Sequence, residues 1–341
     1  MDLTELRSAN LLEVVERLAR NHNLDIHDVS AREAIAGLFA NEFQKVVDNP
    51  NRIFGWRTEA MFAFVAASLG KVQMLKGEDT GLLVSATAVT PPDYRLLLSN
   101  GAQMFVEVKN WNPNGVFPKP FRIRSVDVNR LRAYSSAFGI ELRFAIYWRK
   151  PNQWTFTRED DFEQIGDKLQ IAFVDAMKRS TMCDLGDFMV GTVPPLSLQL
   201  TSERPIQLPE EGNIEFRIGR ASLSSGGVKI ESELERQLAW YFMRFGSWTA
   251  FRQKPIIHGN EFLGLENLLE PEEWEPSQGF ALLGSLSSMI SNVFRFRTTR
   301  DDRVSLLSPQ GDPASFGVSI PDDFAGDVLK LWRFHLQPSQ A

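Results

Sequence analysis

The sequence contains a single cysteine, Cys183, and four histidines among 341 residues. One cysteine excludes an intrachain disulfide and a zinc site built from several thiolates. The histidines at 22, 27, 258 and 335 lack the short spacing of a metal-binding or catalytic histidine motif. Disulfide-stabilised folds and thiolate-bound zinc folds are therefore excluded.

Long hydrophobic runs are also missing. The longest apolar stretch, residues 60–69, covers ten residues, about half of the ~20 that a membrane-spanning helix needs. The first residues include Asp2 and Glu5 and contain no unbroken apolar segment of the kind that a secretory signal has. We therefore expect no transmembrane helix, no membrane partner and a cytoplasmic location.

The net charge of −6 is distributed unevenly along the chain. Residues 52–158 contain 15 Lys and Arg against 7 Asp and Glu, whereas the rest of the chain contains 22 against 36. A basic segment inside an acidic chain is typical of local contact with phosphate groups. An ordinary solvated surface is the alternative explanation, and extending the window to residue 185 reduces the basic excess.

The length of the chain is sufficient for two domains. We expect a helical N-terminal segment over residues 1–50 and a folded α/β unit over 51–185. Proline-rich and charged stretches indicate a linker over 186–211. Residues 212–341 then form a mixed α/β C-terminal domain, whose role would be target recognition, dimerisation or regulation.

Hydrophobic periodicity predicts the elements of these segments. For the first two we expect a helix over 30–47, a break at 49–51, a helix over 57–69, strands near 82–90, 93–98 and 102–110, a helix over 125–138, strands over 142–148 and 154–157, and a helix from 159 to about 178. The core order is α-β-β-β-α-β. For the last segment we expect strands near 214–218 and 250–257, and helices near 231–245, 282–294 and 324–334.

The predicted hairpin over residues 91–110 carries the chemistry. Glu107 and Lys109 are two apart on a strand, so their side chains lie on one face. A three-residue loop over 99–101, with its glycine in the left-handed conformation, places Asp93 opposite Glu107. A two-residue turn would place Asp93 on the other face and mix polar with apolar residues. The hydrophobic pattern therefore favours the three-residue loop.

Two carboxylates close together repel each other, and a hard cation bound by oxygen atoms relieves this repulsion. We expect Mg²⁺, with Mn²⁺ as the alternative, bound by Asp93 and Glu107. Lys109 would orient or activate a water molecule and supply positive charge. The alternative is a surface hairpin on which Glu107 and Lys109 form a simple ion pair.

Glu59 is the only charged residue between Thr58 and Gly70, in a helix that is apolar on every side. Such a helix is buried, and a buried glutamate without a partner is rare. A metal ion at the same site would supply that partner. The alternative is a favourable interaction with the helix dipole in the first turn, with Thr58 as the N-cap.

These residues resemble the PD-(D/E)xK nuclease superfamily, which includes many restriction endonucleases and the archaeal-type Holliday junction resolvases. The resemblance rests on Glu59 in the first core helix, Pro92 and Asp93 at the start of one strand, and Glu107 with Lys109 on the next. It covers roughly a third of the chain. It implies a restriction-endonuclease-like core in which these four residues are catalytic and in which Glu59, Asp93 and Glu107 bind the metal.

The resemblance also implies a metal-dependent endonuclease that acts on DNA. The candidate nucleic-acid contacts are Lys119, Arg122, Arg124, Arg130, Arg132 and Tyr134. The alternatives are a solvated charged face and, for Arg130 and Tyr134, an ordinary amphipathic helix. Arg130 stands where some exonuclease-like relatives carry glutamine. By analogy with restriction enzymes, we expect a role in bacterial defence, as a homodimer or as a subunit of a larger defence complex. The alternatives are a structure-selective nuclease of repair or recombination, and a non-catalytic module that kept the fold.

Overall fold

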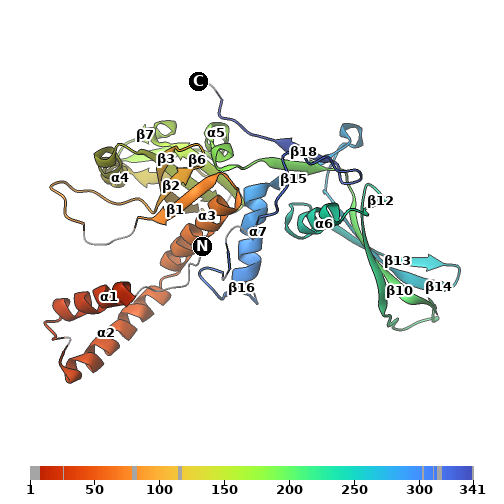
Figure 1. The fold of residues 1–341 in the computed structure, drawn as a ribbon, viewed down its shortest axis with the longest axis horizontal. Coiled ribbons are helices and arrows are strands. Elements are labelled where there is room, and N and C mark those ends of the chain that lie inside the picture. The colour runs from red at the N-terminus through yellow and green to blue at the C-terminus, as the bar shows by residue number, and fades with distance from the viewer. Residues whose placement is uncertain are drawn as a thin grey trace.

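The computed structural model describes residues 8–25, 27–78, 83–113, 117–301, 303–309, 311–312 and 317–339. The fold is mixed α/β. Helices α1 (Ser8–Asn21) and α2 (Val29–Val47) form a hairpin that projects from the body, and α3 (Pro50–Ser68) leads from it into the core (Figure 1). Over these ranges, no helix combines the length and the apolar character that a bilayer span requires.

A five-stranded sheet forms the centre of the N-terminal half. Its order is β1 (Val72–Gly77), β2 (Tyr94–Leu98), β3 (Gln103–Trp111), β5 (Glu141–Trp148) and β6 (Gln153–Arg158). β3 and β5 are parallel because α4 (Ser125–Phe138) connects them, and the other neighbours are antiparallel. Helices α3 and α7 (Leu286–Thr298) cover one face, and α4 covers the other.

Alternate side chains of β3 enter two separate hydrophobic cores. Val106 packs in a core with Phe62 of α3 and Phe294 of α7, whereas Phe105 packs in the opposite core with Leu131 of α4. Phe62 and Phe294 are fully buried, and each such burial stabilises the fold by roughly 2–3 kcal/mol. A helix from the C-terminal part of the sequence therefore contributes to the same core as α3. The division into domains that the sequence predicts stays a prediction.

The remaining described strands form four further sheets, one of them also five-stranded. The first contains β4 (Phe121–Arg124), β8 (Lys168–Ile171) and β7 (Glu163–Ile165), and the second contains β12 (Val228–Lys229), β11 (Ile218–Ser225), β10 (Leu196–Gln207), β14 (Glu261–Glu270) and β13 (Ala250–His258). The third contains β15 (Ala281–Ser285), β9 (Met189–Thr192) and β18 (Leu331–Phe334). The fourth pairs β16 (Thr299–Arg300) with β17 (Arg303–Val304). The helices α5 (Phe173–Arg179) and α6 (Glu233–Phe245) and the 3₁₀ turns Glu159–Asp161, Met182–Leu185 and Pro276–Gln278 complete the described elements. Strands β10, β13 and β14 extend as an arm away from the body (Figure 1).

Several predicted elements are confirmed. The helix over 125–138 has these bounds, and β5, β6, α6 and β13 begin and end within three residues of the predicted positions. The break near 49–51 is shorter than predicted, because α3 already begins at Pro50. Proline is favoured at a first helical position, and the Asn49 side chain accepts a hydrogen bond from the Arg52 backbone N–H at 3.3 Å.

Two predictions for the N-terminal half are wrong. Residues 83–90 form no strand, Leu82 lies outside the described residues, and the first strand of the sheet is instead β1. The helix predicted from 159 to about 178 is a 3₁₀ turn, the hairpin of β7 and β8, and the short helix α5. Pairing of β8 with β4, 44 to 50 residues earlier, overrides the local helical pattern.

Two predictions for the C-terminal half are also wrong. The strand expected near 214–218 begins only at Ile218. The stretch 186–211 contains β9 and β10, and its role as a linker between domains stays a prediction. Residues 324–334 form no helix. The carboxylate of Glu235 accepts hydrogen bonds from the backbone N–H groups of Asp327, Val328 and Leu329 at 2.8–3.1 Å, and β18 then pairs with β9.

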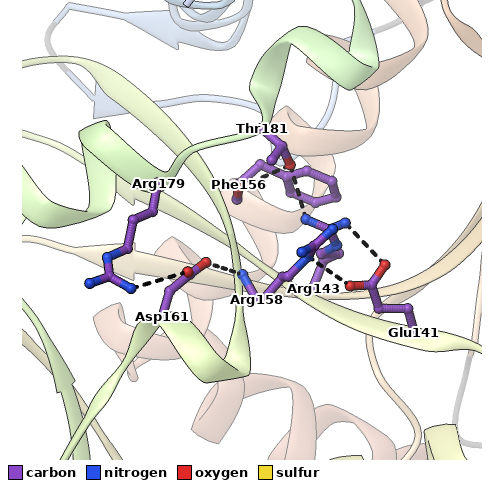
Figure 2. A network of polar contacts seen from close by, with 7 residues as sticks. All are labelled: Glu141, Arg143, Phe156, Arg158, Asp161, Arg179 and Thr181. Carbon is purple, nitrogen blue, oxygen red and sulfur yellow. Dashed lines mark hydrogen bonds and ion pairs between the residues drawn. The ribbon is translucent and has the colours of Figure 1, made fainter. Parts of the chain in front are cut away.

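A polar network joins β5 and β6 to the segments that follow them (Figure 2). The buried Arg143 guanidinium forms an ion pair with Glu141 at 3.0 Å and donates to the Thr181 hydroxyl at 3.1 Å. Arg158 pairs with the same Glu141 at 3.0 Å, and its backbone N–H donates to Asp161 at 2.7 Å. The network fixes this edge of the sheet, at the opposite end of the strand order from β1 and β2.

The β2–β3 hairpin has the predicted register. Tyr94 pairs with Val106, and Leu97 pairs with Gln103. The Leu98 N–H donates to the Ala102 carbonyl at 2.9 Å, which leaves residues 99–101 as the loop. Gly101, the last loop residue, has a φ of 85°. The prediction of a three-residue loop with a left-handed glycine is therefore confirmed.

We expect Gly101→Ala to lower the free energy of unfolding by about 1–2 kcal/mol, because a side chain at positive φ is strained. A Cβ at this position would meet no atom within 4 Å, so crowding adds nothing to the cost. Gly55→Ala, in α3 and equally uncrowded, is the control and should stabilise by up to about 1 kcal/mol. Urea denaturation of both variants measures the difference, and equal effects would contradict the strained loop.

Candidate active site

Asp93, Glu107 and Lys109 meet at the open end of the β2–β3 hairpin. The pair of Tyr94 with Val106 brings Asp93 beside Glu107. One carboxylate oxygen of Asp93, Oδ2, accepts a hydrogen bond from the Val108 N–H at 2.7 Å. The Lys109 ammonium donates to Oε1 of Glu107 and forms an ion pair with it. The structure thus brings three of the four predicted catalytic residues together.

Glu59 approaches from α3, which packs against the other face of the sheet. The helix begins at Pro50, so Glu59 is not in its first turn. The Thr58 hydroxyl donates to the Phe54 carbonyl at 2.7 Å and does not cap the helix. The explanation of Glu59 by a helix dipole and a Thr58 cap is therefore wrong. Glu59 is close enough for its charge to raise the pKa of Asp93.

Burial raises the pKa of all three carboxyl groups. Desolvation raises the pKa of Asp93 to about 6 and that of Glu107 to about 7, although Lys109 lowers both and a neighbouring carboxylate raises each further. Desolvation also raises the pKa of Glu59. For Lys109, burial lowers the pKa, but Glu107 and Asp93 outweigh it, so the pKa is raised and the ammonium stays protonated. These carboxylates would favour a bound cation.

The chemistry of these residues fits a hard divalent cation. In the described part of the chain, no three His, Cys, Asp or Glu side chains form a ready metal-binding cluster. Mg²⁺, however, is usually bound by one or two carboxylates and keeps several water molecules. Asp93 and Glu107 each have a second carboxylate oxygen beyond the one bonded to Val108 or Lys109. They are the principal candidate ligands, for Mg²⁺ or Mn²⁺, and Glu59 is a further one.

The predicted nucleic-acid contacts differ in their surroundings. Five of the six are exposed: Lys119, Arg122, Arg124, Arg130 and Arg132. Arg124 forms an ion pair with Asp127, and Arg132 forms one with Glu159. Tyr134 is buried and donates to Glu78 at 2.9 Å, and burial followed by this hydrogen bond raises its pKa to about 12. Tyr134 also packs on the Phe105 ring and thereby fixes α4 against the sheet. The binding roles stay predictions.

A cavity is lined by Arg57, Arg149 and Arg295 together with Asn110, a group that the sequence did not predict. The three arginines come from α3, from the turn after β5 and from α7. No local motif connects residues so far apart in the sequence. Only the packing of α7 against α3 brings them together.

No protein-family model and no curated protein matches this chain. Among solved structures, the chain is similar to the Holliday junction resolvase Hjc of Archaeoglobus fulgidus, an archaeal hyperthermophile. The alignment covers 34% of this chain and 88% of the resolvase, with 19% sequence identity and a TM-score of 0.25.

We expect Asp93→Asn to stabilise the metal-free protein at about pH 8. The folded-state pKa of Asp93 lies above its ordinary value of 3.8, so ionisation costs stability as the pH rises through the folded pKa. Asparagine can still accept from the Val108 N–H. The gain should be roughly 1–3 kcal/mol at about pH 8 and should disappear below about pH 4, where both proteins are neutral at this position.

Urea denaturation in EDTA at the two pH values measures this effect. Asp323→Asn, which alters an exposed carboxylate, is the control and should change the free energy of unfolding by no more than about 0.5 kcal/mol at either pH. If Asp93→Asn instead lost stability at the higher pH, desolvation would not be raising the pKa of the Asp93 carboxyl group.

Proposed function

We propose that residues 52–158 form the core of a metal-dependent nuclease of the PD-(D/E)xK type that hydrolyses phosphodiester bonds in DNA. The observation that carries this proposal is the meeting of Asp93, Glu107 and Lys109 at one end of a hairpin. A surface ion pair would need only Glu107 and Lys109. It would not need a second carboxylate bonded to the β3 backbone, or the charge of Glu59 nearby.

The order of elements gives further support. Helix α3 is followed by β1, β2 and β3, then by the short strand β4, and then by α4 and β5. This order agrees with a restriction-endonuclease-like core, with β4 as an addition. The basic excess of residues 52–158 favours a polyanionic substrate. Defence against foreign DNA, as a homodimer or within a larger complex, is the setting that we propose by analogy.

Each site residue has a distinct part in the proposed reaction. Asp93 and Glu107 would bind Mg²⁺ or Mn²⁺, with Glu59 as a further ligand, and the ion would supply Lewis-acid chemistry and offset charge on the phosphate. Lys109 remains protonated beside Glu107. It would orient the attacking water or place positive charge near a phosphate oxygen. The Val108 N–H fixes Asp93 in position before the substrate binds.

The proposal predicts that Asp93→Asn and Lys109→Gln each reduce cleavage by about 100-fold or more, because each removes charge that acts in the transition state. Lys168→Gln, which removes an exposed lysine of β8 in a different sheet, is the matched control and should cleave normally. Cleavage of plasmid, branched and single-stranded DNA with Mg²⁺, Mn²⁺ or EDTA measures the effect. Branched DNA separates a structure-selective enzyme from a general endonuclease.

Two results would contradict the proposal. Metal-dependent cleavage that persists in both Asp93→Asn and Lys109→Gln would show that the site lies elsewhere. Failure to cleave any of the three substrates with either metal, by a folded protein, would favour a non-catalytic module that kept the fold.

The role of Glu59 is tested separately, through the dependence of the cleavage rate on metal concentration. If Glu59 helps to bind the ion, Glu59→Gln should raise the Mg²⁺ concentration for half-maximal cleavage by about 10-fold or more, with a smaller effect at saturating metal. Titration of the cleavage rate with Mg²⁺ measures this. An unchanged midpoint would remove Glu59 from the metal site and leave Asp93 and Glu107 as its carboxylates.

A further inference from the structure

A cavity of about 70 Å³ lies at the junction of α3, the ends of β3 and β5, and α7. Arg57, Asn110, Tyr147, Arg149 and Arg295 supply its polar lining. Since one water molecule occupies about 30 Å³ of liquid, the cavity has room for roughly two waters or for one tetrahedral oxyanion.

The three arginines of this cavity have no acidic partner in the part of the chain that the structure describes. Across the described ranges, none of them forms an ion pair with a carboxylate. Neutral groups hold each guanidinium instead. Arg57 donates to the hydroxyls of Thr298 and Thr299 at 2.8 and 3.1 Å. Arg149 lies over a phenylalanine ring at 4.9 Å, and Arg295 donates to an asparagine side chain.

The positive charges act on one another. Burial lowers the pKa of Arg57, and the nearby charges of Arg295 and Arg149 lower it further. Burial raises the pKa of the Tyr147 hydroxyl, and the charges of all three arginines lower it. Arg57 and Arg295 are half-buried whereas Arg149 is exposed, so the repulsion costs most at the first two unless a negative charge binds among them.

Two residues that line this cavity each carry a buried side-chain atom with no hydrogen-bond partner in the described part of the chain. These atoms are Nε of Arg57 and Oδ1 of Asn110. Nearly all buried polar groups in folded proteins are hydrogen-bonded, so such atoms require an explanation. The Arg57 N–H needs an acceptor oxygen. The Asn110 amide can turn to offer a donor, because its oxygen and nitrogen are interchangeable in shape.

We propose that Arg57, Arg149 and Arg295 form a binding site for one phosphate group, presented by a nucleic-acid strand or by a free nucleotide. Arginine suits this role because its planar fork of N–H donors matches the oxygens of a phosphate. The site is distinct from the carboxylate site. Asn110 follows Lys109 on β3, so the two side chains point to opposite faces of the strand. The proposal needs neither a metal nor the carboxylates.

Calorimetric titration of the full chain with inorganic phosphate tests the site, with chloride at equal ionic strength as the reference. Arg149→Gln and Arg295→Gln should each weaken phosphate binding about tenfold or more, because each removes one charged fork. Arg297→Gln, which alters an exposed arginine of the same helix outside the cavity lining, is the matched control and should bind like the parent. Arg295→Lys keeps the charge and should bind phosphate better than Arg295→Gln. It replaces Arg295→Gln in the comparison if that variant is unstable.

Two further probes identify the source of the phosphate. If a strand supplies it, inorganic phosphate should compete with a single-stranded oligonucleotide, and the pocket variants should bind that oligonucleotide more weakly. If a free nucleotide supplies it, a nucleoside monophosphate should lose affinity in the same variants. No specific binding of phosphate, or equal affinities of parent and pocket variants for all three probes, would overturn the site. These titrations measure binding without metal and without cleavage, so failure of the catalytic proposal would leave this site standing.

Discussion

The pairing of β2 with β3 is the constraint on which the candidate site depends. Side chains at alternate positions, such as Leu96 and Val106, are fully buried against α3 and α7. A slip of one residue would turn this apolar set toward α4 and would move Glu107 and Lys109 to the opposite face. Burial of one face thus selects the register, and the register brings Asp93 to Glu107. The hydrogen bond from the Val108 N–H to Asp93 then fixes the carboxylate beyond the last strand pair.

This geometry is costly in the absence of a cation. Desolvation raises the pKa of Asp93, Glu107 and Glu59 together, and Lys109 offsets only part of the effect. Elsewhere in the chain, the buried carboxylate of Glu235 accepts three backbone N–H groups. The carboxylates of the candidate site accept hydrogen bonds from fewer donors. Functional sites commonly give up stability in this way.

Sequence patterns predicted the parts of the fold that depend on local contacts and on the burial of one face. The hairpin and α4 belong to this group, because their apolar periodicity alone specifies face and register. Elements determined by distant partners were not predictable. The backbone of 327–329 bonds to Glu235, some ninety residues earlier, and β8 pairs with β4. For the same reason, the ordered set of Asp93, Glu107 and Lys109 was visible as a motif, whereas the three cavity arginines were not.

Helix α7 packs against α3, which carries one residue of each proposed site, Arg57 and Glu59. Its Phe294 shares a core with α3, and its Ser291 accepts a hydrogen bond from the Trp154 indole of β6 at 2.9 Å. The Arg57 guanidinium bridges from α3 to Thr298 and Thr299 at the end of α7. A phosphate bound by Arg57 and Arg295 would therefore favour the packing of α7 on α3, because a ligand stabilises the arrangement that binds it. Since α3 also carries Glu59, such a ligand would stabilise the helix position from which Glu59 reaches the carboxylate site.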